Sequence, residues 1–117
     1  MKMSKKVYIA GPYRGATKEE VEMNIEFAKG FGRWVARQGF IPVIPHANTA
    51  LMDYTAPDLS DEFWLNATME LLKMCDMILM IPGWLNSTGC IAEYEYARDN
   101  DIKIIDVDDI LLTRLGR

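Results

Sequence analysis

The sequence predicts a single α/β domain in which helices cover both faces of a parallel sheet. Short apolar runs of strand length alternate four times with longer segments of helical composition, most of which carry apolar residues at helical spacing, which is the pattern of consecutive β-α units. The chain has 117 residues, half of them hydrophobic, which is enough for one compact core and too little for two. We therefore expect residues 1–117 to form one domain.

The first β-α unit begins near the amino terminus. Lys6–Ala10 is a short apolar run that ends at Gly-Pro, which is typical of a strand buried on both faces. Thr17, with Glu20 three residues later, predicts a capping box at the start of a helix, and Gly39 predicts its end. The expected inward positions are Val21, Ile25, Ala28, Gly32 and Val35, and the apolar face is widened by Phe27, Phe31 and Trp34.

A second strand and a long loop follow. Phe40–Ile44 is apolar, and Pro42 within it has no amide proton to donate, which favours the edge of the sheet. From Pro45 to Leu59 the chain has the composition of a loop. Loops of this length in small domains are usually functional or mobile.

Two more β-α units complete the pattern. Ser60 or Asp58 can cap a helix that runs to about Met74, and Asp76–Ile81 is the most hydrophobic strand and should be central. The later elements are expected at Pro82–Thr88 (loop), Gly89–Asn100 (helix), Ile102–Val107 (strand) and Asp109–Leu115 (short helix). The inward positions of the two longer helices are expected to be Phe63, Ala67, Leu71 and Leu72 in the first, and Ile91, Ala92 and Tyr96 in the second.

An edge position for the second strand and a central one for the third favour the strand order 2-1-3-4 with right-handed crossovers. This is a three-layer α/β sandwich of about four parallel strands, similar to flavodoxin-like and Rossmann-like folds. In this order the loops after the first and third strands leave the sheet side by side, at the point where open α/β sheets bind ligands. We expect a polar, phosphorylated small molecule to bind between them.

Composition excludes several classes of function. Lys and Arg number 13 against 17 Asp and Glu, and a net charge of −4 argues against polymeric nucleic acid, although a mononucleotide needs only one or two cations. Cys75 and Cys90 are too far apart for a C-x-x-C pair, so we expect buried free thiols, no metal and no cofactor. The first apolar run is too short for a signal peptide or a membrane-spanning helix. We expect a cytoplasmic protein with no membrane partner.

The loop after the first strand is a candidate anion site. It lacks the spacing of G-x-G-x-x-G and has no G-K-[ST], which excludes a dinucleotide fingerprint and a P-loop. What remains is a tight turn whose amides, together with the guanidinium of Arg14, can hold a phosphate. The alternative is a solvated arginine beside an ordinary strand-to-helix turn.

The loop after the third strand leads to a carboxylate. Glu93 lies in the first turn or two of its expected helix, where the helix dipole should lower the pKa and keep the group ionised, so that it can act as a nucleophile. The alternative is a surface residue that stabilises the dipole. Glu95 projects from another face, so the two acids are not spaced for the acid and base roles of a glycosidase. Ser87 and Thr88 can cap the helix or donate to a bound phosphate.

Other side chains have open roles. His46 is either a hydrogen-bonding loop residue or a pocket residue, and no partner for a catalytic triad is evident. Tyr13, Trp64 and Trp84 can stack on a base, or they can fill the core or an interface.

Three short motifs, in this order and spacing, resemble the nucleoside 2-deoxyribosyltransferase superfamily over nearly the whole chain. They are Tyr8-Ile-Ala-Gly-Pro12, Asp76 at the start of the third strand, and Ser87-x-Gly89-x3-Glu93-x3-Ala97. The chain looks most similar to small phage and bacterial members (DUF4406-like) and to 2-deoxynucleoside 5′-monophosphate N-glycosidases.

The resemblance implies that Glu93 attacks the anomeric carbon, releases the base and forms a glycosyl ester, which water then hydrolyses. It also implies that Arg14 and Ser87 bind the phosphate, which favours a monophosphate hydrolase. The substrate is expected to be a small-molecule nucleotide or nucleoside, bound by Tyr8, Gly11, Pro12, Tyr13, Arg14, Gly15, His46, Ser87 and Gly89.

The sequence departs from the superfamily at Thr68, where many relatives carry an aspartate. A threonine cannot hold a proton in the same way, so protonation of the leaving base falls to His46, Tyr13 or water. The rival hypotheses are a 2-deoxyribosyltransferase that exchanges bases and a non-catalytic nucleotide-binding or sensing module. A neighbouring subunit often completes such sites, and the many large apolar side chains predict a homodimer or tetramer.

Overall fold

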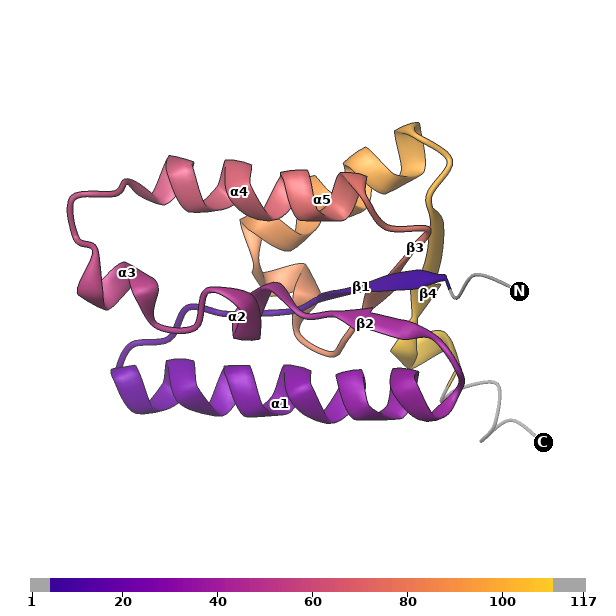
Figure 1. Cartoon of the computed structure of the whole chain (residues 1–117), viewed down its shortest axis with the longest axis horizontal. Helices are drawn as coiled ribbons and strands as arrows, with labels where there is room; N and C mark the ends of the chain where they lie inside the picture. The colour runs from indigo at the N-terminus through magenta and orange to yellow at the C-terminus, as the bar shows by residue number, and fades with distance from the viewer. Residues whose placement is uncertain (1–4, 111–117) are drawn as a thin grey trace.

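A computed structural model describes residues 5–110, which form a four-stranded sheet with helices on both faces (Figure 1). The strands are β1 (Lys6–Ala10), β2 (Ile41–Val43), β3 (Met77–Met80) and β4 (Lys103–Asp106). The helices are α1 (Lys18–Arg37), α2 (Pro45–Asn48), α3 (Met52–Thr55), α4 (Asp61–Lys73) and α5 (Thr88–Asp99), with a 3-10 turn η1 (Trp84–Asn86). All neighbouring strands are parallel and their order is β2-β1-β3-β4. The predicted α/β class and the strand order 2-1-3-4 are confirmed.

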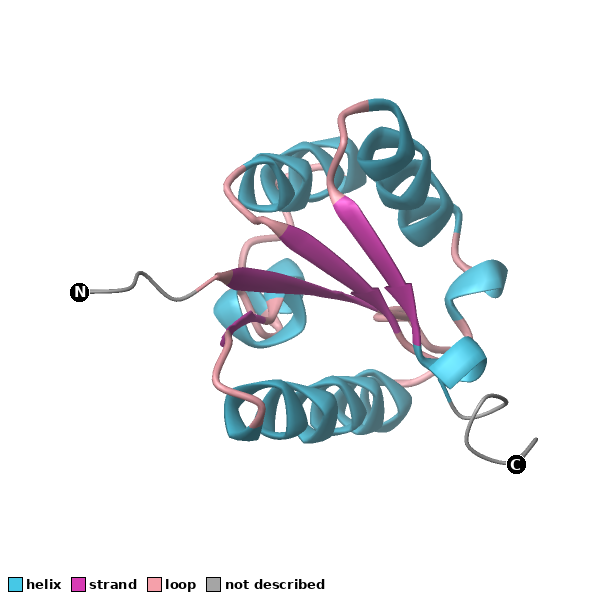
Figure 2. Cartoon of the chain, turned by 90° about the vertical axis from the view of Figure 1, so that its right-hand side faces the viewer, coloured by secondary structure: helices cyan, strands magenta, loops and turns pink. Residues whose placement is uncertain are grey.

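The sheet separates two apolar layers, with α1 on one face and α4 and α5 on the other (Figure 2). Because side chains alternate along a strand, Val7 and Ile9 of β1 pack on the α1 side, whereas Tyr8 and Ala10 pack on the α4 and α5 side. All residues of β3 are buried, as expected for a central strand. Tyr8 therefore points toward the layer that holds Glu93.

Helix α1 matches its sequence pattern closely. The capping box of Thr17 and Glu20 is present, and the buried residues are the five that the helical spacing predicts. Gly39 has φ +90°, the left-handed conformation in which glycine ends helices. A Cβ atom at Gly32 would lie 2.4 Å from Cδ1 of Ile44, so the absence of a side chain lets α1 approach the sheet.

Part of the solvent-facing surface of α1 is also apolar. Phe27 is half exposed and packs edge-to-face on Phe31, with ring centroids 5.2 Å apart. Together with Trp34, Val107 and Ile110 they line a groove of about 510 Å³. Grooves of this kind occur at protein interfaces; the homodimer or tetramer stays a prediction.

The segment after β2 differs from the expected loop. Strand β2 is three residues long and lies at the edge of the sheet, as Pro42 predicts. Beyond it, two one-turn helices, α2 and α3, interrupt the range expected to be loop. Pro45 is the first residue of α2, a position that proline favours because no hydrogen bond needs its missing N–H.

Helix α4 begins as predicted: Ser60 caps it, with Oγ accepting the Phe63 N–H at 3.1 Å.

Two residues of α4 and α5 that are expected to face inward are exposed instead. Phe63 itself is 47% exposed because the first turn of α4 extends beyond the carboxyl ends of the strands (Figure 1). In α5, Ala92 is exposed, and the buried positions are Cys90, Glu93 and Ala97. The other expected inward residues of α4 and α5 are partly or fully buried.

At the carboxyl end, β4 is one residue shorter at each end than predicted. Residues 107–110 are helical. The rest of the helix expected at Asp109–Leu115 lies outside the described residues.

Candidate functional site

A cavity of about 470 Å³ opens where the loops after β1 and β3 leave the sheet. Its walls come from β1, from these two loops, from the segment that runs from α2 through α4, and from the first half of α5. Nine of the ten predicted site residues line it: Tyr8, Gly11, Pro12, Tyr13, Arg14, His46, Ser87, Gly89 and Glu93. The fold thus brings together residues from both motif-bearing loops and from the segment after β2.

Gly15 lies outside the cavity lining, and its place has a steric reason. A Cβ atom at Gly15 would lie 2.5 Å from Cβ of Glu20, so glycine lets the loop fold onto the capping box. Gly11 does line the cavity, and a Cβ atom there would lie 2.4 Å from Cγ1 of the buried Ile81. These glycines allow close packing of the loop that carries Arg14.

Glu93 is the buried acid of the cavity. It is 8% exposed, and the Tyr8 hydroxyl donates a hydrogen bond to its Oε2. Burial raises the pKa of Glu93 to about 7, while the hydrogen bond from Tyr8 acts in the opposite direction. The expectation that the helix dipole lowers this pKa is wrong. Glu93 is the sixth residue of α5, beyond the first turn where the dipole acts, and the loss of solvation is the larger effect.

Tyr8 and Thr68 flank Glu93 with hydroxyl groups. Burial, followed by the proximity of Glu93, raises the pKa of Tyr8 well above its ordinary value, so Tyr8 stays a hydrogen-bond donor. Thr68 lines the cavity, and its hydroxyl donates to the Leu65 carbonyl at 3.0 Å. Position 68 is the one at which many members of the resembled superfamily carry an aspartate. Because threonine carries no charge, no carboxylate acts on Glu93 from position 68, and the raised pKa of Glu93 comes from burial.

His46 holds the loop after β1. Its Nε2 lies 2.9 Å from the Gly11 carbonyl oxygen and 3.0 Å from that of Pro12. Carbonyl oxygens only accept, so the proton belongs on Nε2. Burial lowers the pKa of His46 and keeps the ring neutral, and Nδ1 has no hydrogen-bond partner among the described residues. With no proton on Nδ1, the ring is poorly suited to protonate a leaving base.

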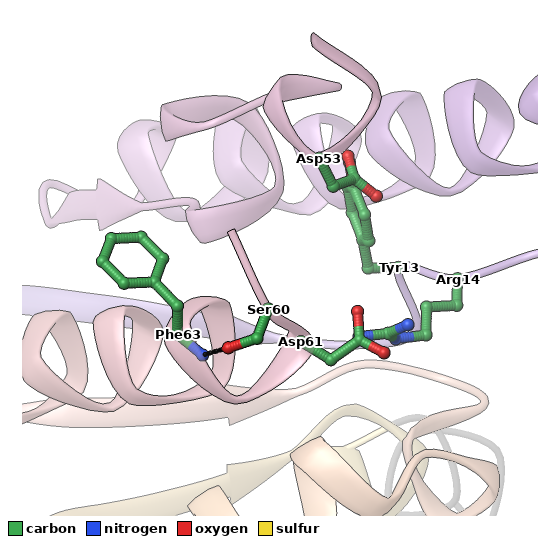
Figure 3. Close-up of polar contacts among 6 residues, drawn as sticks. All are labelled: Tyr13, Arg14, Asp53, Ser60, Asp61 and Phe63. Atoms are coloured by element: carbon green, nitrogen blue, oxygen red, sulfur yellow. Dashed lines mark hydrogen bonds and ion pairs between the residues drawn. The ribbon is translucent and has the colours of Figure 1, made fainter. Parts of the chain in front are cut away.

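Tyr13 ties the same loop to α3. Its hydroxyl donates to Oδ1 of Asp53 at 2.8 Å (Figure 3). The same hydroxyl accepts the Leu51 N–H at 3.2 Å. Burial, together with the hydrogen bond to Asp53, raises the pKa of Tyr13 to about 12. Its proton is therefore committed to Asp53. His46, Tyr13 and water are the three groups expected to protonate the leaving base. Because His46 and Tyr13 both use their protons in the hydrogen bonds described above, water is the group that remains available.

Arg14 lies at the mouth of the cavity, where its Nη2 is 3.0 Å from Oδ1 of Asp61 (Figure 3). The two side chains are 63% and 73% exposed. The side chain of Asn24, in α1, fixes the backbone of this loop by donating to the carbonyl oxygens of Tyr13 at 3.0 Å and Arg14 at 3.2 Å. Arg14 is thus a cavity residue that is already paired with an anion.

Ser87 combines the two roles left open by its sequence. Its Oγ accepts the Cys90 N–H at 3.2 Å and caps α5. The hydroxyl keeps its own proton, which can be donated to a ligand in the cavity. Gly89, in the first turn of α5, lies close to α4: a Cβ atom there would be 3.1 Å from Cδ2 of Leu65.

The aromatic candidates differ. Trp64 and Tyr13 line the cavity, and the buried Nε1 of Trp64 has no hydrogen-bond partner among the described residues. Trp84 is buried elsewhere, stacked on Tyr94 with ring centroids 5.1 Å apart, and donates to Asp106 at 3.2 Å. Trp84 therefore fills the core, as one of its two sequence interpretations predicts.

Sequence reasoning missed four polar residues that line the cavity: Thr49, Asp53, Asp61 and Asn86. The length of the 45–59 segment, which contains Thr49 and Asp53, is typical of functional or mobile loops, but nothing in its spacing shows which side chains turn inward. Asp53 and Asp61 reach the cavity through the placement of α3 and α4.

Among residues 5–110, no group of three His, Cys, Asp or Glu side chains comes together as metal ligands, and no helix is long and apolar enough to cross a membrane. Cys75 and Cys90 are buried free thiols, as expected, and burial raises the pKa of each to about 11.

The comparison with curated proteins finds no match to this chain. A family model described as "Domain of unknown function (DUF7768)" matches residues 5–107. Its description names no activity, so the resemblance to nucleoside 2-deoxyribosyltransferases stays a prediction. Because the match includes every described strand and both motif-bearing loops, the chain belongs to the DUF7768 family.

Proposed function

We propose that this protein hydrolyses the N-glycosidic bond of a 2-deoxynucleoside 5′-monophosphate, with Glu93 as the nucleophile. The observation that supports this most is that a buried carboxyl, an arginine and a helix-capping serine line one cavity. The cavity volume of about 470 Å³ is in the range of small-molecule sites.

Glu93 has the properties that a nucleophilic carboxylate needs. With a pKa of about 7, it is ionised in a substantial fraction of molecules at neutral pH. Because the group is desolvated, its charge acts strongly on a nearby oxocarbenium-like carbon. The hydrogen bond from Tyr8 to Oε2 orients the carboxylate and leaves Oε1 for attack.

The reaction has two balanced steps. Oε1 of Glu93 bonds to C1′ of the sugar as the C1′–N bond breaks, and the base leaves with the bonding electrons and takes a proton from water. A second water then attacks C1′ and gives its proton to the hydroxide left by the first, while the ester bond breaks, which restores the carboxylate and frees 2-deoxyribose 5-phosphate. Arg14 and Ser87 bind the phosphate outside the bonds that change.

The test is release of free base from a panel of the four common 2-deoxynucleoside 5′-monophosphates, measured by chromatography. We expect Glu93→Gln and Glu93→Ala to abolish release, because neither side chain can form the ester. The matched control is Glu95→Gln, which neutralises an exposed acid of the same helix and should retain release. Unchanged release in either Glu93 variant contradicts the nucleophile assignment.

The same assay separates the rival functions. Adding a second base accelerates turnover of a transferase and yields a new nucleoside, whereas a hydrolase yields the sugar phosphate alone. A protein that binds nucleotide and releases no base is a binding module. Mass spectrometry of acid-quenched protein should also detect the deoxyribosyl phosphate ester on the peptide containing Glu93.

A further inference from the structure

The mouth of the cavity contains more negative than positive charge. Among the described residues that line it, Arg14 is the cation, since His46 is kept neutral by burial. Three acidic residues line the same cavity: Asp53, Asp61 and Glu93. Asp53 is engaged by the Tyr13 hydroxyl, and Asp61 pairs with Arg14 itself.

We propose that Asp61 is a specificity-determining residue, an internal anion that competes with a ligand's phosphate for Arg14. A phosphate that enters the cavity must displace the Asp61 carboxylate from Nη2 of Arg14, at 3.0 Å, and then lie near that carboxylate's charge. An unphosphorylated ligand meets neither penalty. Asp61 therefore reduces the preference for phosphorylated ligands below what Arg14 alone provides. The inference rests on the proposed function for the class of ligand.

The location of the pair makes the competition reversible. Both side chains are largely solvent-exposed, and ion pairs of this kind contribute little to stability, so a phosphate dianion can replace one partner. The backbone of Arg14 is held by Asn24, which does not depend on Asp61. Displacement of Asp61 therefore leaves the backbone of Arg14 in place, and the guanidinium becomes free to bind the ligand.

Asp61 can be altered without removing the cap of its helix. The cap of α4 is the hydroxyl of Ser60, and Asp61 is the first residue inside the helix. Asp61→Asn therefore removes one charge and preserves the shape of the side chain. Glu62 lies beside it in the same first turn and does not line the cavity, so Glu62→Gln is the matched control for a general loss of negative charge.

Calorimetry with 2-deoxyribose 5-phosphate, inorganic phosphate and 2-deoxyribose tests the proposal without knowledge of the base. We expect Asp61→Asn to bind the two phosphate probes about three- to tenfold more tightly, with no change for 2-deoxyribose. Glu62→Gln should leave all three affinities within about twofold. In the double variant with Arg14→Ala, the gain from Asp61→Asn should be smaller, because only the repulsion between the phosphate and the Asp61 charge remains to be removed.

An equal or lower phosphate affinity in Asp61→Asn overturns the proposal and makes Asp61 a residue that positions Arg14. A gain that is undiminished without Arg14, or no phosphate binding in either protein, overturns it as well. These outcomes are independent of catalysis. A protein that releases no base but gains phosphate affinity in Asp61→Asn contradicts the proposed function and supports the inference; base release without this gain does the reverse.

Discussion

The inner wall and the mouth of the cavity both hold an acid beside a hydrogen-bonding partner, yet their environments differ. Glu93 is 8% exposed beside the buried Tyr8, whereas Asp61 is 73% exposed beside Arg14. Burial raises the pKa of Glu93 to about 7. A solvated pair such as that of Asp61 is screened by water and salt.

Because their environments differ, the two acids are suited to different roles within one candidate site. A desolvated carboxyl near its titration point is suited to chemistry but destabilises the fold when it ionises. A solvated ion pair contributes little to stability and can exchange partners, which suits ligand selection. Substitutions at the inner wall should therefore change stability and pH dependence, whereas those at the mouth should change affinity.

The largest effect is expected for the stability of Glu93→Gln. The pKa of Glu93 is higher in the folded protein, about 7, than the ordinary value of 4.5, so the folded state binds more protons between these values. Stability from this group is complete below about pH 4.5 and is lost as the pH rises through 7. The loss at pH 8 is about 3 kcal/mol, and Glu93→Gln should recover up to that amount.

Urea unfolding at pH 4.5 and pH 8 measures this effect, with Asp61→Asn as the exposed comparison. The Asp61 variant should change the free energy of unfolding by less than about 1 kcal/mol at both pH values. If Glu93→Gln is no more stable than the unmodified protein at pH 8, the ionised carboxylate of Glu93 does not destabilise the fold.

A smaller effect is expected for Tyr8→Phe. The hydrogen bond from Tyr8 lowers the pKa of Glu93, so its loss should raise that pKa further, by about one unit. The pH at which base release falls on the acid side should move upward by the same amount. Carbon-13 NMR titration of labelled glutamate follows the pKa even in the absence of turnover.

Tyr13→Phe is the matched control, since Tyr13 also donates to a carboxylate, that of Asp53 at the mouth. It should leave the titration of Glu93 unchanged. An equal shift in both variants would mean that the hydroxyl of Tyr8 has no specific influence on Glu93.

The smallest effect is expected from the two serine caps. Ser60→Ala and Ser87→Ala each remove a hydroxyl that accepts a helix N–H, and each should lower the free energy of unfolding by about 1 kcal/mol. Only Ser87 lines the cavity, so only Ser87→Ala should also weaken binding of 2-deoxyribose 5-phosphate, by about three- to tenfold. Equal phosphate affinities in the two variants would assign Ser87 to capping alone.

Local sequence was sufficient for most of the fold. The capping box at Thr17, the edge proline at position 42 and the apolar run of β3 depend on neighbours within a few residues, and the structure matches each of them. The strand order then follows from general rules of α/β connections, which bring both motif-bearing loops to one cavity. Nine predicted site residues line that cavity for this reason.

The properties of those residues depend on groups far away in the chain. Tyr8 and Glu93, 85 positions apart, meet only after β1 packs against α5, and burial rather than the helix dipole then sets the pKa of Glu93. Arg14 meets Asp61 only because α4 begins beside the mouth, a placement that no local spacing encodes. Sequence patterns report contacts between near neighbours, whereas desolvation and long-range ion pairs arise when the layers pack. The location of the site was therefore available from the sequence, and its electrostatics were decided by the tertiary structure.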